Sequence, residues 1–283
     1  MLTSIRSRWL AALAAGALTA VLAAGCSDDK GTNVNQEPPE IPPASTFAID
    51  LSDFSTPTRA CSALEGNGGA PASSQANWAW AAGKVLAWSI FATVSLAVPV
   101  AAFIEALNHE PTQEADGTWV WAYDFEATQV LHSAELHGKT TEEGIQWSMH
   151  ISKEGEFSDF VWYTGECNLP GTSGSWTVYA SPANPTPLVD IQWHLSSNRT
   201  TGDTKYTNVV PDGPENGGYI HHGITGGVPF DAFFDIYNKG QENLACIEWS
   251  RTAQNGRVTD PGHYGDQDWH CWDTGHNDIS CVD

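Results

Sequence analysis

The chain has 283 residues and a formal net charge of −22, from 34 acidic and 12 basic side chains. So acidic a chain repels polyanions, which excludes charge-driven binding to nucleic acid or to anionic lipid headgroups. Its hydrophobic content of 41% is enough to fill the core of one domain.

Residues 1–25 have the three parts of a secretory signal peptide. A short basic region holds Arg6 and Arg8, an apolar stretch follows, and small residues precede Cys26. The sequence therefore predicts export, with cleavage before Cys26. The alternative is an ordinary signal peptide cut near Ala24, which would leave Cys26 without a role.

The segment Leu22-Ala23-Ala24-Gly25-Cys26 resembles the lipobox of bacterial lipoproteins, although its aliphatic residue stands one position further from the cysteine. The resemblance implies a covalent diacylglycerol and acyl (palmitate) anchor on Cys26, and hence a membrane partner through this lipid. Two or more acyl chains hold a protein stably at a bilayer. Ser27 after the cysteine favours the outer membrane over the inner membrane of the bacterial envelope.

Residues 26–46 are rich in Asp, Gly, Asn, Glu and Pro, a composition typical of a disordered tether. We expect residues 47–283 to form a single β-rich domain. Phe47 and Ile49 alternate with smaller residues at its start, which predicts a short strand or docking segment.

One long helix is predicted at about residues 75–108. Residues 85–104 carry no formal charge, and an apolar stretch of this length is typical of a transmembrane helix. We instead expect a core helix, because serine and threonine interrupt the stretch and Pro99 must kink or split it.

Residues 117–273 are predicted to form successive strands separated by turns. Apolar and polar residues alternate in 145–151 and again in 189–195, which gives each strand one dry and one wet face. The expected fold class is mainly β (α+β): an antiparallel meander forming a curved half-barrel or open barrel packed around one long apolar, Pro-kinked helix. This outline is similar to that of half-barrel lipoprotein carriers and chaperones, and the body resembles uncharacterised bacterial lipoproteins.

Five cysteines follow Cys26, and in an exported protein we expect them to pair. An odd number leaves at least one thiol free or paired between chains. Cys271 and Cys281 are the pair that the sequence predicts, and the other partners stay open. No CxxC spacing occurs, so neither a thioredoxin-like motif nor a zinc ribbon is indicated.

Two sets of residues are candidates for binding. Tryptophans on or near the dry face predict contacts with an apolar ligand, and the histidines and aspartates near the C-terminus are of the types that bind a divalent metal. The alternatives are purely structural roles: core packing for the tryptophans, and a polar terminal loop for the histidines and aspartates. The ligand-binding candidates are Trp88, Trp119, Trp121, Trp147, Trp162 and Trp193, and the metal candidates are His263, Asp266, Asp268, His270 and His276.

No GxSxG, P-loop or GxGxxG motif is present, so no catalytic residue and no further cofactor is predicted. Three functions are compatible with the sequence. The first is a lipid-anchored envelope protein with a structural role or a protein or glycan partner. The second is a carrier or chaperone that binds a lipid or acyl chain between helix and sheet. The third is a metal-dependent enzyme that uses the C-terminal cluster.

Overall fold

The computed structural model describes residues 37–49 and 74–281. The predicted signal peptide, the lipobox-like Cys26 and Cys61 lie outside the described residues. The chain divides into two units, Met1–Glu37 and Pro38–Asp283, and only the second is described below.

One antiparallel sheet of 14 strands forms most of this unit, and the strands follow one another in the sheet in the order of the sequence. This confirms the mainly β antiparallel meander. Strands β1 and β14 are the two edges, so the sheet is not closed. The strands are β1 Thr112–Gln113, β2 Trp119–Ala127, β3 Val130–Thr140, β4 Ile145–Lys153, β5 Phe157–Cys167, β6 Ser173–Ser181, β7 Asn184–Leu195, β8 Gly202–Asn208, β9 Tyr219–Ile224, β10 Ala232–Asn238, β11 Asn243–Trp249, β12 Gly256–Thr259, β13 His270–Trp272 and β14 Asp278–Ile279.

The two faces of the sheet differ as the alternation predicts. In β4, Trp147 and Met149 are buried, while Gln146, the residue before Trp147, is exposed. The buried side chains face the helices, and we call this side the helix face. The other side carries polar residues such as Gln146 and Gln192, and we call it the polar face.

Glycines on the helix face make room for tryptophan rings on neighbouring strands. A Cβ at Gly165 would lie 2.1 Å from ring carbon Cε3 of Trp176, closer than any side chain permits. The indole ring therefore lies over the glycine backbone, where it covers a site that has no side chain of its own. Four such cross-strand pairs recur: Gly138–Trp147, Gly165–Trp176, Gly174–Trp193 and Gly256–Trp272.

The helix expected at 75–108 is two helices, which corrects the prediction of one long helix. Helix α1 (Ala76–Ser95) and helix α2 (Ala97–Ala106) meet at Leu96 with a bend of 75°. Pro99 is the third residue of α2, where its missing N–H breaks no helical hydrogen bond. The chain thus avoids a proline in a helix interior by starting a new helix upstream of it.

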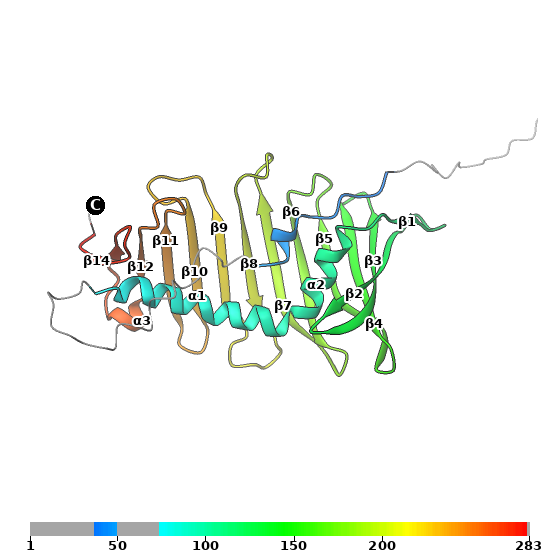
Figure 1. Ribbon diagram of the computed structural model, residues 1–283, viewed down its shortest axis with the longest axis horizontal. Coiled ribbons are helices and arrows are strands. Elements are labelled where there is room, and N and C mark those ends of the chain that lie inside the picture. The colour runs from blue at the N-terminus through cyan, green and yellow to red at the C-terminus, as the bar shows by residue number, and fades with distance from the viewer. Residues whose placement is uncertain (1–36, 50–73, 282–283) are drawn as a thin grey trace, which may run out of the picture. The chain divides into compact units, whose positions relative to one another are not determined.

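By length and composition, no single helix within the described residues could span a bilayer, and α1 and α2 pass that test only as a bent pair. Figure 1 shows both on the same face of the sheet, with α1 running across the strands and α2 turning toward β2. Helix α2 packs against β2 and β3, and α1 packs against β12, β13 and β14. The pair is therefore held near both ends of the sheet.

The segment before the helices also packs on the helix face. A short 3-10 helix, η1 (Ala44–Thr46), contacts β7, and Thr46 and Phe47 are fully buried. The Phe47 ring stacks on the ring of Phe103 in α2 with a centroid distance of 5.0 Å. Phe47 is thus a docking residue, and the compact unit begins upstream of the boundary at residue 46 that the composition predicts for the tether.

A groove beside helix α1

Helix α1 is apolar on nearly all sides, but only one side is buried. Trp78, Ala81, Ala82 and Val85 recur at the spacing of one helical face and are buried against the sheet. Other side chains in the second half of the helix, such as Leu86 and Ala87, are exposed.

A groove follows the side of α1 where its second half crosses strands β8 to β10. Its volume is about 340 Å³, within the range of small-molecule sites in proteins. The helix supplies Ala87, Trp88 and Phe91, and the sheet supplies Ile236 from β10. These four side chains give the groove an apolar wall.

Polar groups surround this apolar wall. An apolar wall combined with polar groups is typical of sites that bind an apolar body and orient one polar end. The polar residues that line the groove are Lys84, Asn208, Glu215 and Asn238.

A stripe of exposed aliphatic residues lies next to the groove. Leu86, Ile90 and Val94 are 52%, 58% and 74% exposed, and they recur every four residues along α1. Ala87 is exposed between this stripe and the groove. The stripe therefore lies beside the groove, since Leu86 and Ile90 are the helix neighbours of the groove residues Ala87 and Phe91.

Lys84, at the groove rim, is tied to the sheet by an ion pair. Its Nζ lies 3.0 Å from Oδ2 of Asp260, which also accepts a hydrogen bond from the Trp80 indole. Asn243 donates to the other carboxylate oxygen. Burial alone would raise the pKa of Asp260, but the hydrogen bonds from Asn243, Lys84 and Trp80 outweigh burial and lower it. Asp260 therefore stays ionised and fixes this part of α1.

The N-terminus of α1 is held by β14. The carboxylate of Asp278 accepts hydrogen bonds from the backbone N–H groups of Ala76 and Asn77, at 3.2 Å and 3.0 Å. These are N–H groups that a helix leaves unpaired, so Asp278 caps the helix from a distant strand. The Asn77 amide also donates to the carbonyl of Cys271.

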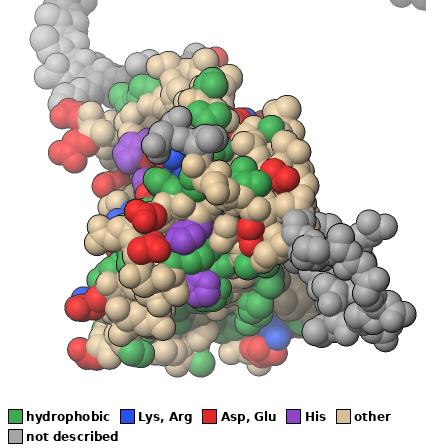
Figure 2. All heavy atoms as spheres, turned by 90° about the vertical axis from the view of Figure 1, so that its left-hand side faces the viewer, with side chains coloured by type: hydrophobic (Ala, Val, Ile, Leu, Met, Phe, Trp, Pro, Cys, Tyr) green, Lys and Arg blue, Asp and Glu red, His purple; other side chains and the backbone are tan. Residues whose placement is uncertain are grey.

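The histidines proposed as metal ligands lie in this region, but they stack on aromatic rings. His263 stacks on Trp80 and His276 stacks on Trp78, with centroid distances of 3.6 Å and 4.4 Å. His270 stacks on Tyr264 at 3.6 Å. Figure 2 shows this end of the unit, where histidine and acidic side chains lie close together on the surface.

The two aspartates of the metal prediction lie in the loop before β13. Asp266 accepts from the ring of His270 at 3.1 Å, and its other hydrogen bond is to the backbone N–H of Asp268. Within residues 37–49 and 74–281, no three His, Cys, Asp or Glu side chains converge in a way that could hold a metal ion. The structure uses the cluster to fasten α1, and we call Asp260, His263, Tyr264, His276 and Asp278 the C-terminal clamp.

The predicted disulfide between Cys271 and Cys281 is confirmed, with a Cα–Cα distance of 5.3 Å. The disulfide links β13 to the segment after β14, next to the clamp. Of the described cysteines, Cys167 and Cys246 are free thiols, and burial raises the pKa of each. Neither has the depressed pKa of a reactive cysteine.

Among the tryptophans proposed as ligand contacts, only Trp88 lies in the groove. Trp119 packs against the core with partial exposure, and the other four are core residues: Trp121, Trp147, Trp162 and Trp193. The sequence analysis missed Phe91 and Ile236. Phe91 follows Trp88 by three residues on the same helical face, so helical spacing could have found it.

Comparison of the chain with protein-family models, with curated proteins and with solved structures finds no match. The function is therefore inferred from the groove and the residues around it.

Proposed function

We propose that this protein is a lipid-anchored protein of the bacterial cell envelope that binds an apolar ligand, a lipid or an acyl chain, in the groove beside α1. The observation that carries the proposal is the groove itself, with an apolar wall of Ala87, Trp88, Phe91 and Ile236 and polar side chains beside it. Each ligand methylene that leaves water there contributes about 0.8 kcal/mol.

The sequence supports the cellular part of the proposal. The lipobox-like segment ending at Cys26 would place acyl chains at the N-terminus and hold the protein at a membrane, with the outer membrane favoured by Ser27. A protein held at a bilayer lies beside the ligands that such a groove would take up.

The arrangement of the helices supports the architectural part. We propose that the sheet curves around α1 and α2 as a half-barrel, with the ligand between helix and sheet. Support comes from the two helices and Phe47, which lie on the same face of one open sheet.

A second candidate function is docking of a partner protein on the aliphatic stripe. The observation that favours it is the exposure of Leu86, Ile90 and Val94 on one side of α1. Contiguous exposed apolar surface of this kind marks interaction sites.

The groove is tested by titration of the exported chain with cis-parinaric acid, a fluorescent fatty acid, in wild type and in two variants. Ala87→Glu places a carboxylate at the groove, and Ala79→Glu places the same charge at an exposed position of α1 outside it. We expect Ala87→Glu to weaken binding by about tenfold, which corresponds to 1.4 kcal/mol, and Ala79→Glu to bind like wild type. Absence of binding by wild type, or equal loss in both variants, would refute the proposal.

A further inference from the structure

The polar face of the sheet, opposite the helices, carries a series of hollows that connect with one another. One of about 600 Å³ crosses β3 to β6, and a second of about 500 Å³ crosses β4 to β7. They share Gln146, Glu166 and Ser175 on their floors and walls. Together they form one trough across the middle of the polar face.

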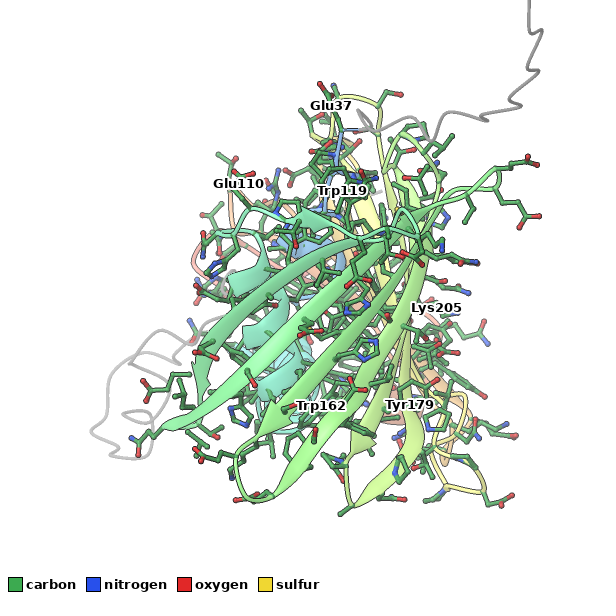
Figure 3. All side chains as sticks on the ribbon, turned by 90° about the vertical axis from the view of Figure 1, so that its right-hand side faces the viewer. Glu37, Glu110, Trp119, Trp162, Tyr179 and Lys205 are labelled. Atoms are coloured by element: carbon green, nitrogen blue, oxygen red, sulfur yellow. A yellow bond between two sulfur atoms is a disulfide. The ribbon has the colours of Figure 1, made fainter. Side chains whose placement is uncertain are left out.

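The trough continues toward the tips of two hairpins. A third hollow of about 590 Å³ shares His137 with the first, and a fourth of about 560 Å³ shares Ser158 and Asp159 with the third. The fourth is lined by aromatic and proline side chains, including Phe160 and Tyr179. Figure 3 looks onto this end of the sheet, with Tyr179 near the lower ends of the strands.

The polar side chains in the central part of the trough are not paired with each other. Gln146, Thr164, Glu166, Ser175 and Gln192 form no side-chain hydrogen bond or ion pair to any described residue. They present free donors and acceptors to one hollow surface.

The same face looks different on the neighbouring strands. Asp203 on β8 accepts from His221 on β9 at 3.0 Å, and Glu248 on β11 accepts from Arg257 on β12 at 2.8 Å. Polar groups there satisfy one another across the strands. Toward the edges of the trough, Thr177 and His194 are likewise paired, with Asp190 and Asp203. The five central side chains of the trough are the ones left for a ligand or solvent.

The chemistry of the trough selects among ligands. A net charge of −22 repels nucleic acid and other polyanions, and Lys139 at one end is already paired with Asp116. Strands β4 to β6 are central, with their backbone groups used in the sheet, so a peptide cannot join as an added strand. Hydroxyls, primary amides and one carboxylate match the paired donors and acceptors of sugar hydroxyls.

We propose that this trough binds a neutral oligosaccharide. Gln146, Glu166 and Gln192 would hydrogen-bond its hydroxyl or acetamido groups, and the aromatic hollow at Tyr179 would stack on a sugar ring. The length of the trough, four connected hollows, suits a ligand of several sugar units. The proposal does not rest on the groove beside α1, which lies on the opposite face.

The test uses the exported full chain and three probes: hexasaccharides of glucose and of N-acetylglucosamine, both neutral, and a hexamer of galacturonic acid as the anionic probe. Binding is measured by saturation-transfer NMR and calorimetry. Two trough variants, Glu166→Ala and Gln146→Ala, have matched controls on exposed sites outside it, Glu126→Ala and Gln241→Ala. Circular dichroism melts check that all four remain folded.

We expect at least one neutral hexasaccharide to bind, the galacturonate hexamer not to bind, each trough variant to bind about fivefold or more weakly, and the controls to bind like wild type. Tyr179→Ala should remove the NMR signal transfer to one terminal sugar ring. The proposal is overturned if neither neutral probe binds, if the anionic probe binds better than both, or if the controls lose as much affinity as the trough variants.

Discussion

Helices α1 and α2 lie on the same sheet, but different interactions hold them there. Helix α2 is fixed by apolar packing: Ala102 and Phe103 are fully buried, and the Phe103 ring packs on Phe47 and Trp176. Helix α1 is fixed at its N-terminal half by the charges, caps and ring stacks of the C-terminal clamp.

The difference explains why a groove forms beside one helix and not along the aromatic cluster of the other. Packed aromatic rings fill the space under α2, because Phe47, Phe103 and Trp176 contact one another closely. The clamp holds α1 at discrete points near its start, where it packs against β12 to β14, and the groove further along the helix is lined by residues of α1, β8 and β10. The two anchors should also respond differently to mutation and to pH.

The largest effect is expected at the aromatic anchor. Phe103→Ala would leave a cavity between Phe47 and Trp176 and lower the free energy of unfolding by about 3–5 kcal/mol. Urea denaturation at pH 7.5 and pH 5.5 measures it, and the loss should be the same at both. A loss below about 1 kcal/mol would show that this cluster does not anchor α2.

A smaller effect is expected at the clamp. Asp260→Ala leaves the Lys84 ammonium and the Trp80 indole without their acceptor at a buried site, which costs about 2–3 kcal/mol. Asp116→Ala is the matched control, because Asp116 and Lys139 form a pair of the same 3.0 Å length at an exposed site, where water screens the attraction and the loss should be much smaller. Equal losses in the two variants would contradict the role given to Asp260.

The smallest effect is a dependence on pH. Burial lowers the pKa of His276, and attraction to Asp273 opposes this only in part. The unfolded chain therefore takes up a proton at a higher pH than the folded chain does. The stability that His276 contributes is complete above the unfolded pKa of about 6.5 and is lost as the pH falls below that value and through the lower pKa of the folded state.

Hydrogen exchange at the amides of α1 tests this directly. Exchange near Trp78 should rise more between pH 7.5 and pH 5.5, after correction for intrinsic rates, than exchange in α2. His276→Gln should reduce the difference between the two helices. If both helices respond alike in wild type and variant, the clamp is not the pH-sensitive anchor.

The sequence predicted the parts of the fold that depend on short-range pattern. Alternation in residues such as 145–151 placed the strands and their dry faces, and the spacing of Cys271 and Cys281 led to the correct disulfide. Pro99 was recognised as a helix disruptor, but the break lies three residues upstream at Leu96. A proline is accommodated when it lies in a first turn, and that position depends on where the new helix can begin.

Long-range contacts could not be predicted in the same way. The histidines of residues 263–276 look like metal ligands until their partners are known, and those partners, Trp78 and Trp80, lie nearly 200 residues earlier. The pairing of Gly165 with Trp176 depends on strand register, which the pattern leaves open. The groove is likewise a long-range feature, because it forms where residues of α1 meet residues of β10 that lie more than 140 positions later in the sequence.

The most direct test of the central claim is native mass spectrometry of the exported chain, with Cys26→Ser to remove the anchor, in wild type and Ala87→Glu. The account predicts an additional mass of several hundred daltons on wild type that denaturation releases, and a much smaller bound fraction on the variant. Both proteins at the mass of the bare chain, less two hydrogens for the disulfide, would contradict it.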